Sequence, residues 1–204
     1  MEWSKTPITA EEATKRIECL PEFLRPIKEA AGAIASKSAW IEDHSGAILA
    51  GHYLDMGLID AHDLVLFPPI SREILRIYEK VNDFSLPDIL IEFLAHLNGC
   101  NIFDLRIYGA PASMARNPPT IDRSRCTPLD ISSGRHWRVG YALASEDDLL
   151  FASKNVGDDG QIGYFITPAG LVIGRGNGSP EVDERSGPWS NVTDWLASEI
   201  GQVR

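Results

Sequence analysis

Two clusters of carboxylates are the residues whose type and spacing come nearest to a metal site. They are Glu146, Asp147 and Asp148, followed by Asp158 and Asp159. Calcium loops space their ligands as Asp-x-Asp-x-Asp-Gly with a glutamate further on, and neither cluster has this spacing. We therefore predict that these carboxylates lie in turns, and that the protein holds no metal and no cofactor.

Histidines and nucleophiles show no spacing typical of catalysis. The histidines are His44, His52, His62, His96 and His136. No two of them are three or four residues apart, so no helix offers a pair of imidazole ligands. Cys19, Cys100 and Cys126 are far apart and form no Cys-x-x-Cys pair. The chain has no Gly-x-Ser-x-Gly motif, and no cysteine has activating neighbours. We predict no catalytic residue, and interpret His136 as a surface histidine beside a core Trp137.

Charge is distributed unevenly along the chain. The net charge of −10 argues against a general nucleic-acid binder, because contact with phosphates needs a basic surface. Residues 140–204 hold ten Asp or Glu against four Lys or Arg, whereas residues 105–139 hold six arginines against two aspartates. Two interpretations stay open. These regions pair with each other or lie on separate solvated faces, or the acidic region faces a basic partner.

The elements that must position these residues are organised around residues 69–99. A helix is predicted from apolar residues spaced three and four apart. They are Leu86, Ile89, Leu90, Phe93, Leu94 and Leu97. We expect Ser85 and Asp88 to form a capping box, and Asn98-Gly99 to end the helix. Upstream, Ser71 is expected to cap a second helix. The apolar face of that helix consists of Ile74, Leu75, Ile77, Tyr78 and Val81.

The N-terminal part is predicted to be a helical lead. Thr9 and Glu12 form a capping box that opens a helix to about Leu20, and residues 27–40 have a helical pattern. Residues 47–50 suggest a short strand or turn. The Pro68-Pro69 break divides the chain into a lead, residues 1–67, that packs on a core domain, residues 68–204. Whether the lead forms a lobe of its own stays open.

The C-terminal part predicts a strand meander closed by a helix. We expect strands at residues 101–108, 137–144, 149–152, 162–167 and 171–174, and a long loop at residues 110–134. Ser190 or Asn191 is expected to cap the last helix. Its inward residues are Val192, Trp195, Leu196 and Ile200. The class is α+β, with N-terminal helices, a mainly antiparallel sheet of about five to six strands and a closing helix.

The sequence shows no signal for a membrane. No stretch approaches the roughly 20 apolar residues that span a bilayer, and the N-terminus lacks the apolar run of a signal peptide. We therefore expect a cytoplasmic protein.

The order of these elements resembles the SUKH superfamily, which contains yeast cell-wall-assembly regulators and bacterial immunity proteins. The residues that carry the resemblance in the helical unit are Ile74, Glu79, Leu86, Pro87, Phe93, Leu94, Asn98 and Gly99. Further matches are the turn at residues 157–160, Gly170 and the Trp195-Leu196 pair. The resemblance covers residues 69–200, and the long arginine-bearing loop departs from a compact member of the family.

The resemblance implies a binding protein, an antidote that neutralises a toxin domain such as a nuclease. An acidic surface suits a basic toxin, since electrostatic attraction speeds capture. The expected partner-binding residues are Glu146, Asp147, Asp148, Asp158, Asp159, Glu181, Asp183 and Glu184. One alternative is a regulatory adaptor or scaffold of the same fold. Another is an enzyme that holds an anionic substrate with the arginines of residues 116–138 and uses His136 as base. The sequence leaves the oligomeric state open.

Overall fold

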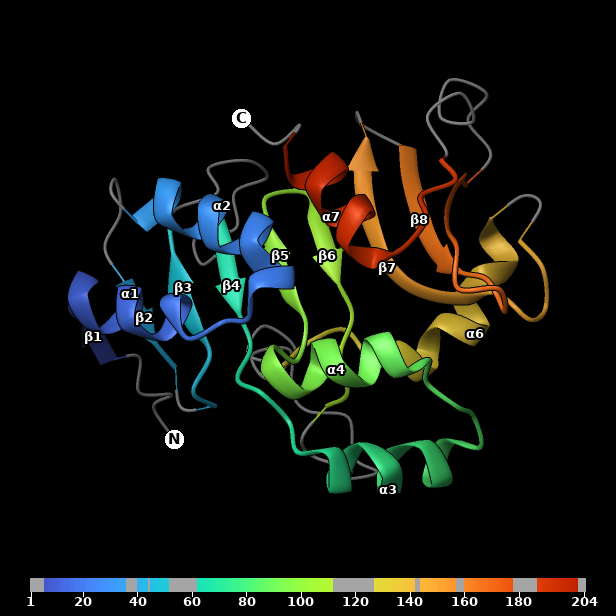
Figure 1. Ribbon diagram of the computed structural model, residues 1–204, viewed down its shortest axis with the longest axis horizontal. Coiled ribbons are helices and arrows are strands. Elements are labelled where there is room, and N and C mark those ends of the chain that lie inside the picture. The colour runs from blue at the N-terminus through green and yellow to red at the C-terminus, as the bar shows by residue number, and fades with distance from the viewer. Residues whose placement is uncertain are drawn as a thin grey trace.

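The computed structural model describes residues 6–35, 40–43, 45–51, 62–111, 127–141, 144–156, 160–177 and 187–201. Within them one sheet is built from β1 Thr6–Ile8, β2 Trp40–Glu42, β3 Ile48–Ala50, β4 Leu64–Leu66, β5 Cys100–Ile102, β6 Leu105–Ile107, β7 Leu149–Val156, β8 Gly160–Ile166 and β9 Val172–Gly176. Each strand pairs antiparallel with the next in the sequence, so the order across the sheet is β1 to β9 (Figure 1). The α+β class is confirmed, but the prediction of five to six strands was too low.

The helices lie before, between and after these strands. They are α1 Ala10–Glu18, α2 Arg25–Ala35, α3 Arg72–Asn82, α4 Asp88–His96, α6 Gly134–Trp137 and α7 Val192–Ile200. Short 3-10 turns occur at η1 Glu22–Leu24, η3 Ile131–Ser133 and η4 Arg138–Gly140. None of the helices in this described part of the chain is long and apolar enough to cross a membrane.

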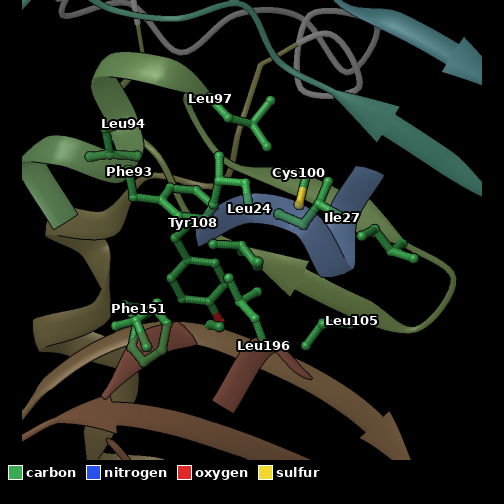
Figure 2. Close-up of a cluster of buried hydrophobic side chains, with 14 of the residues drawn as sticks. Leu24, Ile27, Phe93, Leu94, Leu97, Cys100, Leu105, Tyr108, Phe151 and Leu196 are labelled. Atoms are coloured by element: carbon green, nitrogen blue, oxygen red, sulfur yellow. The ribbon is translucent and has the colours of Figure 1, made fainter. Parts of the chain in front are cut away.

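One face of the sheet is apolar across almost its whole width. Residues paired directly across antiparallel strands point to the same side, so the register identifies the members of each face. A row on this face runs through Trp40, Ala50, Leu64, Ile102, Leu105, Lys154 and Ile162. Helices α2 and α7 lie side by side over it (Figure 1). Figure 2 shows Ile27 of α2, Leu105 of β6 and Leu196 of α7 in one buried cluster.

The opposite face changes character half-way across the sheet. The corresponding row runs through Ile41, Leu49, Val65, Asn101, Arg106, Ser153, Gly163 and Arg175. Leu49 and Val65 belong to a second, smaller apolar cluster with Ala47 and Phe67. From β5 onward the same row is mostly polar, and we call this part of the face the polar half of the sheet.

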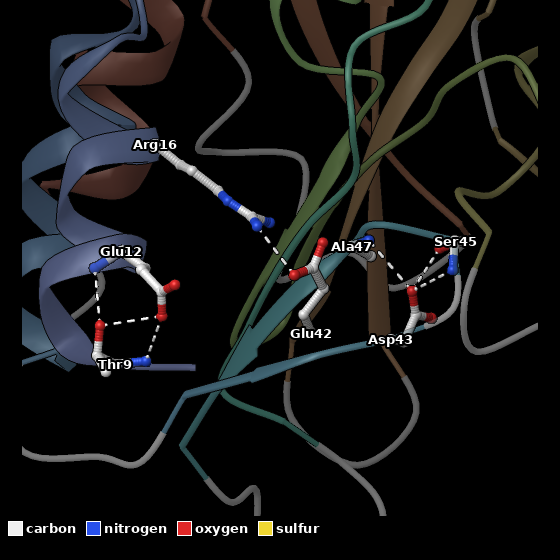
Figure 3. Close-up of polar contacts among 7 residues, drawn as sticks. All are labelled: Thr9, Glu12, Arg16, Glu42, Asp43, Ser45 and Ala47. Carbon is white, nitrogen blue, oxygen red and sulfur yellow. Dashed lines mark hydrogen bonds and ion pairs between the residues drawn. The ribbon is translucent and has the colours of Figure 1, made fainter. Parts of the chain in front are cut away.

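The N-terminal part combines the predicted helices with four strands, three of which, β1, β2 and β4, were not predicted. The capping box is confirmed: Thr9 and Glu12 satisfy each other's backbone amide at the start of α1 (Figure 3). Arg16 reaches from α1 to Glu42 of β2, with 2.9 Å between Nη2 and Oε2. Helix α2 ends at Ala35 and residue 40 begins a strand, so the predicted helix was too long. At residues 47–50, where the sequence suggests a short strand or a turn, the structure has the strand β3.

Residues 1–67 also join the sheet directly. Four of the nine strands, β1 to β4, lie in this lead, and β4 pairs with β5 of the following part. In Figure 1 the blue and cyan strands continue the same sheet as the green and orange ones. Three-residue strands are too short to show an alternating pattern, which is why the sequence did not indicate β1, β2 and β4.

The α3–α4 unit confirms most of its predicted pattern. Ser71 caps α3 by accepting a hydrogen bond from the amide of Ile74, and the apolar residues expected on α4 are buried except for Ile89, which is partly buried. The capping box at Ser85 was wrong, because Pro87 is the N-cap and makes no side-chain cap bond. The amide of Leu86 donates instead to the carboxylate of Glu79. Three apolar residues of α3 are exposed instead of buried.

Two predicted strands were wrong. Residues 101–108 form the hairpin β5–β6, and the chain reverses at Phe103, which has a φ of +47°. Apolar and polar residues continue to alternate through this reversal, so the sequence pattern predicts one long strand instead of two short ones. The stretch that begins at Trp137 is not a strand. It continues from α6 into η4, and residues 142–143 lie outside the described part.

The last strands and the closing helix lie where they were predicted, although β7 continues beyond the predicted residues 149–152 to Val156. The tight turn before β9 is present, with Gly170 at a φ of +82°. Asn191 caps α7 by accepting from the amide of Asp194. All four expected inward residues of α7 are buried. The expected turn at residues 157–159 lies outside the described residues.

Candidate binding groove

An open groove lies on the polar half of the sheet, beside α6 and η4. We call it the sheet groove, and its volume is about 600 Å³. The lining residues that define it here are Arg106, Tyr108, Trp137, Tyr141, Ser153, Gln161 and Asn177. They lie on β6, β7, β8 and α6 or directly after β6, η4 and β9, so the groove exists only after the sheet has formed.

The floor of the groove is set by the pairing of three strands. Arg106 of β6 lies opposite Ser153 of β7, and Ser153 lies opposite Gly163 of β8. A Cβ atom on Gly163 would lie 2.8 Å from the ring of Tyr141. The missing side chain at this position is therefore what allows the Tyr141 ring to lie close to the sheet. Ser153 is buried beneath the groove, whereas Arg106 is exposed at its rim.

Helix α6 supplies the aromatic wall. A Cβ atom on Gly134 would lie 2.7 Å from the carbonyl oxygen of Leu150, so only glycine allows α6 to approach β7 this closely. The Trp137 ring then meets Tyr108 edge to face, with 5.6 Å between ring centroids. Trp137 is still 44% exposed. The expectation of a core tryptophan was therefore wrong, and this ring is available for contact.

A network of amides fixes the far end of the groove. The hydroxyl of Tyr141 donates to Oε1 of Gln161 at 2.6 Å. The side-chain nitrogen of Gln161 donates to Asn155, and its backbone amide donates to Oδ1 of Asn177. These bonds hold Tyr141 in one orientation and connect β7, β8 and the end of β9.

The two tyrosines of the groove are neutral hydrogen-bonding groups. Burial raises the pKa of Tyr108 above its usual range, and the hydrogen bond with Ser153 lowers it only in part. Burial likewise raises the pKa of Tyr141. Arg106 brings a positive charge. The groove thus offers aromatic faces, phenol hydroxyls, amides and one guanidinium, which suits the capture of a mixed polar and apolar surface.

The predicted acidic residues are only partly within the described chain. Glu146 and Asp147 are exposed, whereas Asp148 is buried and its carboxylate accepts from the amide of Ser145. The carbonyl oxygen of Glu146 accepts a hydrogen bond from Arg138 of η4, which places this turn next to η4 and hence beside the sheet groove. The other expected partner-binding residues lie outside the described residues. They are Asp158, Asp159, Glu181, Asp183 and Glu184.

The described arginines near His136 point to different segments. Arg135 donates to the backbone oxygens of Asn82 and Asp83, while Arg138 donates to Glu146. His136 is exposed and does not line the sheet groove. The remaining arginines of this stretch, Arg116, Arg123 and Arg125, lie outside the described residues. The described part of the chain therefore brings no pair of arginines together around His136.

Sequence reasoning did not select the residues of the sheet groove. Arg106, Ser153 and Gln161 belong to three different strands and share no motif. Among the described residues, no three His, Cys, Asp or Glu side chains come together as in a metal site. A scan against protein-family models finds no family that matches this chain, and a search of curated proteins finds no relative.

Proposed function

We propose that this chain is a non-enzymatic, cytoplasmic protein-binding module of the SUKH type, which binds and neutralises a basic toxin domain such as a nuclease. The observation that carries the proposal is an exposed tryptophan held against a buried tyrosine in an open groove, with an arginine at the rim. Tryptophan, tyrosine and arginine are the residue types that contribute most binding energy at protein interfaces. Trp137, Tyr108 and Arg106 therefore form the proposed anchor.

The charge of the chain supports a basic partner. The net charge is −10, and the residues from 140 onward carry most of it. Glu146 and Asp147 are exposed beside η4, close to the Trp137 wall. In this proposal the acidic residues attract the partner over distances up to a Debye length, about 8 Å at physiological salt, and the groove supplies the close contacts. The carboxylate of Asp148 is buried and bonded within its own turn. The electrostatic attraction therefore comes from its exposed neighbours Glu146 and Asp147.

The proposal is tested by capture, rescue and a matched pair of variants. The tagged full chain is used to capture proteins from its native cells at low salt, and increasing salt is then applied. A basic partner that is toxic when expressed alone, and harmless when this chain is co-expressed, is the expected result. A partner that is harmless on its own would favour the adaptor instead.

Comparing Trp137→Ala with Phe103→Ala shows whether binding depends on the sheet groove or on exposed aromatic side chains in general. Phe103 is 36% exposed and lies outside the sheet groove, so it is the control. We expect Trp137→Ala to weaken binding of the purified partner about thirtyfold, as measured by calorimetry, because a truncated anchor costs about 2 kcal/mol. Phe103→Ala should bind like the wild type. Equal affinities of both variants would show that the groove is not the binding site.

A further inference from the structure

An apolar stripe runs along the exposed side of α3. Ile74, Ile77 and Val81 are 40%, 51% and 64% exposed, although the spacing of this helix predicts that they belong to its buried face. The buried residues of α3, through which it packs on the rest of the protein, are Leu75 and Tyr78. We call the three exposed residues the α3 stripe. In Figure 1, α3 lies outside α4 at the edge of the molecule.

The stripe is presented by a firmly held helix. Ser71 caps its first turn, and Asp83 ends it in the left-handed conformation with a φ of +51°. The hydroxyl of Tyr78 donates to the carboxylate of Asp130, which ties the helix to the segment before α6. The exposed side chains are therefore fixed in place and need little ordering to make a contact.

The spacing of the stripe is that of a helix–helix seam. Ile77 follows Ile74 by three residues, and Val81 follows Ile77 by four. Alternating steps of three and four residues define the a and d positions of a heptad, with β-branched residues at both kinds of position here. The stripe thus fits the face of another helix better than an extended segment.

The charges beside the stripe select its partner. Glu73 and Lys80 are both exposed and, two turns apart, lie on its solvent-facing border. When two α3 helices run antiparallel, Glu73 of each faces Lys80 of the other, and both contacts are attractive. When they run parallel, the copies of each residue lie on opposite sides of the seam, so neither Glu73 nor Lys80 meets an opposite charge of this pair. The border is therefore complementary to itself in one orientation.

We propose that α3 is a dimer interface, in which the stripes of two copies of this chain meet antiparallel about a two-fold axis. Such an isologous contact uses one surface twice, as most homodimers do. The seam spans about two turns of an 11-residue helix, so the contact falls in the class of small, transient interfaces. The interface does not use the sheet groove, and the inference is independent of the proposed toxin partner.

Sedimentation velocity of the purified full chain over a concentration series tests this contact. We expect a monomer–dimer equilibrium that Ile77→Asp abolishes, while Val139→Asp leaves it unchanged. Val139 is 87% exposed and lies on η4, so it controls for the loss of an exposed apolar side chain. Circular dichroism checks that both variants remain folded.

Charge exchange distinguishes a second copy from any other occupant. Glu73→Lys and Lys80→Glu should each weaken dimerisation about tenfold, because two attractive contacts become repulsive. The double variant should restore dimerisation, since the pairs are re-formed with opposite sign. A chain that sediments as a monomer throughout would overturn the proposal. A double variant that does not restore dimerisation would also overturn it. The same holds if Ile77→Asp prevents capture of another protein but leaves the sedimentation of the chain unchanged.

Discussion

Asn98 joins two parts of the chain with a single side chain. Its Nδ2 donates to the carbonyl oxygen of Ala110 at 2.7 Å, and its Oδ1 accepts from the amide of Ala110 at 2.9 Å. The residue is buried, just after α4 and before β5. The two bonds satisfy both backbone groups of Ala110, which have no access to water as an alternative partner.

Replacing Asn98 should therefore be costly. We expect Asn98→Ala to lower the free energy of unfolding by about 3 kcal/mol, because a buried donor and a buried acceptor lose their partners together. The exposed Asn177, which accepts one bond from the amide of Gln161, provides the control. Asn177→Ala should cost about 1 kcal/mol or less. Urea unfolding measures both, and equal losses would contradict the role of Asn98.

At the scale of elements, the helices and the last three strands were largely predictable, and most of the short strands β1 to β6 were not. Caps and apolar spacing are local signals, and they located α1, α3, α4 and α7 correctly. Strands β1 to β6 have three residues each, and their stability comes from pairing with neighbours distant in the sequence. Residues 137–144 alternate like a strand, but Gly134 docks their start onto β7 as a helix. Packing thus overrides the local pattern.

The sheet groove could not be predicted for the same reason. Arg106 and Ser153 lie 47 residues apart in the sequence and become neighbours only through the β6–β7 register. Gly163 and Gly134 are the residues whose small size makes room for the groove walls. Nothing in the sequence distinguishes them from other glycines, because the atoms they would clash with come from other elements.

Gly99 positions β5 against β6, and its replacement should disturb both. Its φ is +86°, and a Cβ atom there would lie 2.6 Å from the carbonyl oxygen of Ile107. Gly170 has a similar φ of +82° but open space around it. We expect Gly170→Ala to cost about 1–2 kcal/mol through backbone strain, and Gly99→Ala to cost more because the backbone of β6 must also move. Thermal unfolding compares the stability losses of the two variants. Equal losses would show that the backbone of β6 moves away from the new Cβ atom without cost.

At the scale of the whole molecule, buried tyrosines should make stability fall in alkaline solution. The four tyrosines within the described residues, at positions 78, 108, 141 and 164, are all buried. Burial is the largest cause of a raised pKa at each of them. The unfolded chain, with phenol pKa values of about 10, releases these protons first. Stability is therefore complete below about pH 10 and is lost as the pH rises further.

Unfolding free energies measured in urea between about pH 8 and pH 11 test this expectation, with phenolate absorbance as a second signal. Tyr141→Phe separates the phenols from the lysines, which titrate in the same range. The unfolding free energy of the Tyr141→Phe variant should fall less steeply with pH than that of the wild type. The difference between the two slopes should be up to about 1.4 kcal/mol per pH unit. A slope equal to that of the wild type would show that Tyr141 ionises freely in the folded protein.

The order of the strands also bears on how the chain reaches its fold. Every strand of the sheet pairs with the next strand in the sequence, so each strand can pair with the existing edge of the sheet as soon as it has been synthesised. Loop-closure entropy is small for hairpins such as β5–β6 and β8–β9, and larger for β6–β7, where the paired residues Arg106 and Ser153 lie 47 residues apart. During synthesis, the strand with which each new strand pairs has therefore already been made. Helix α7, which packs beside α2, completes its contacts after the last strand has emerged.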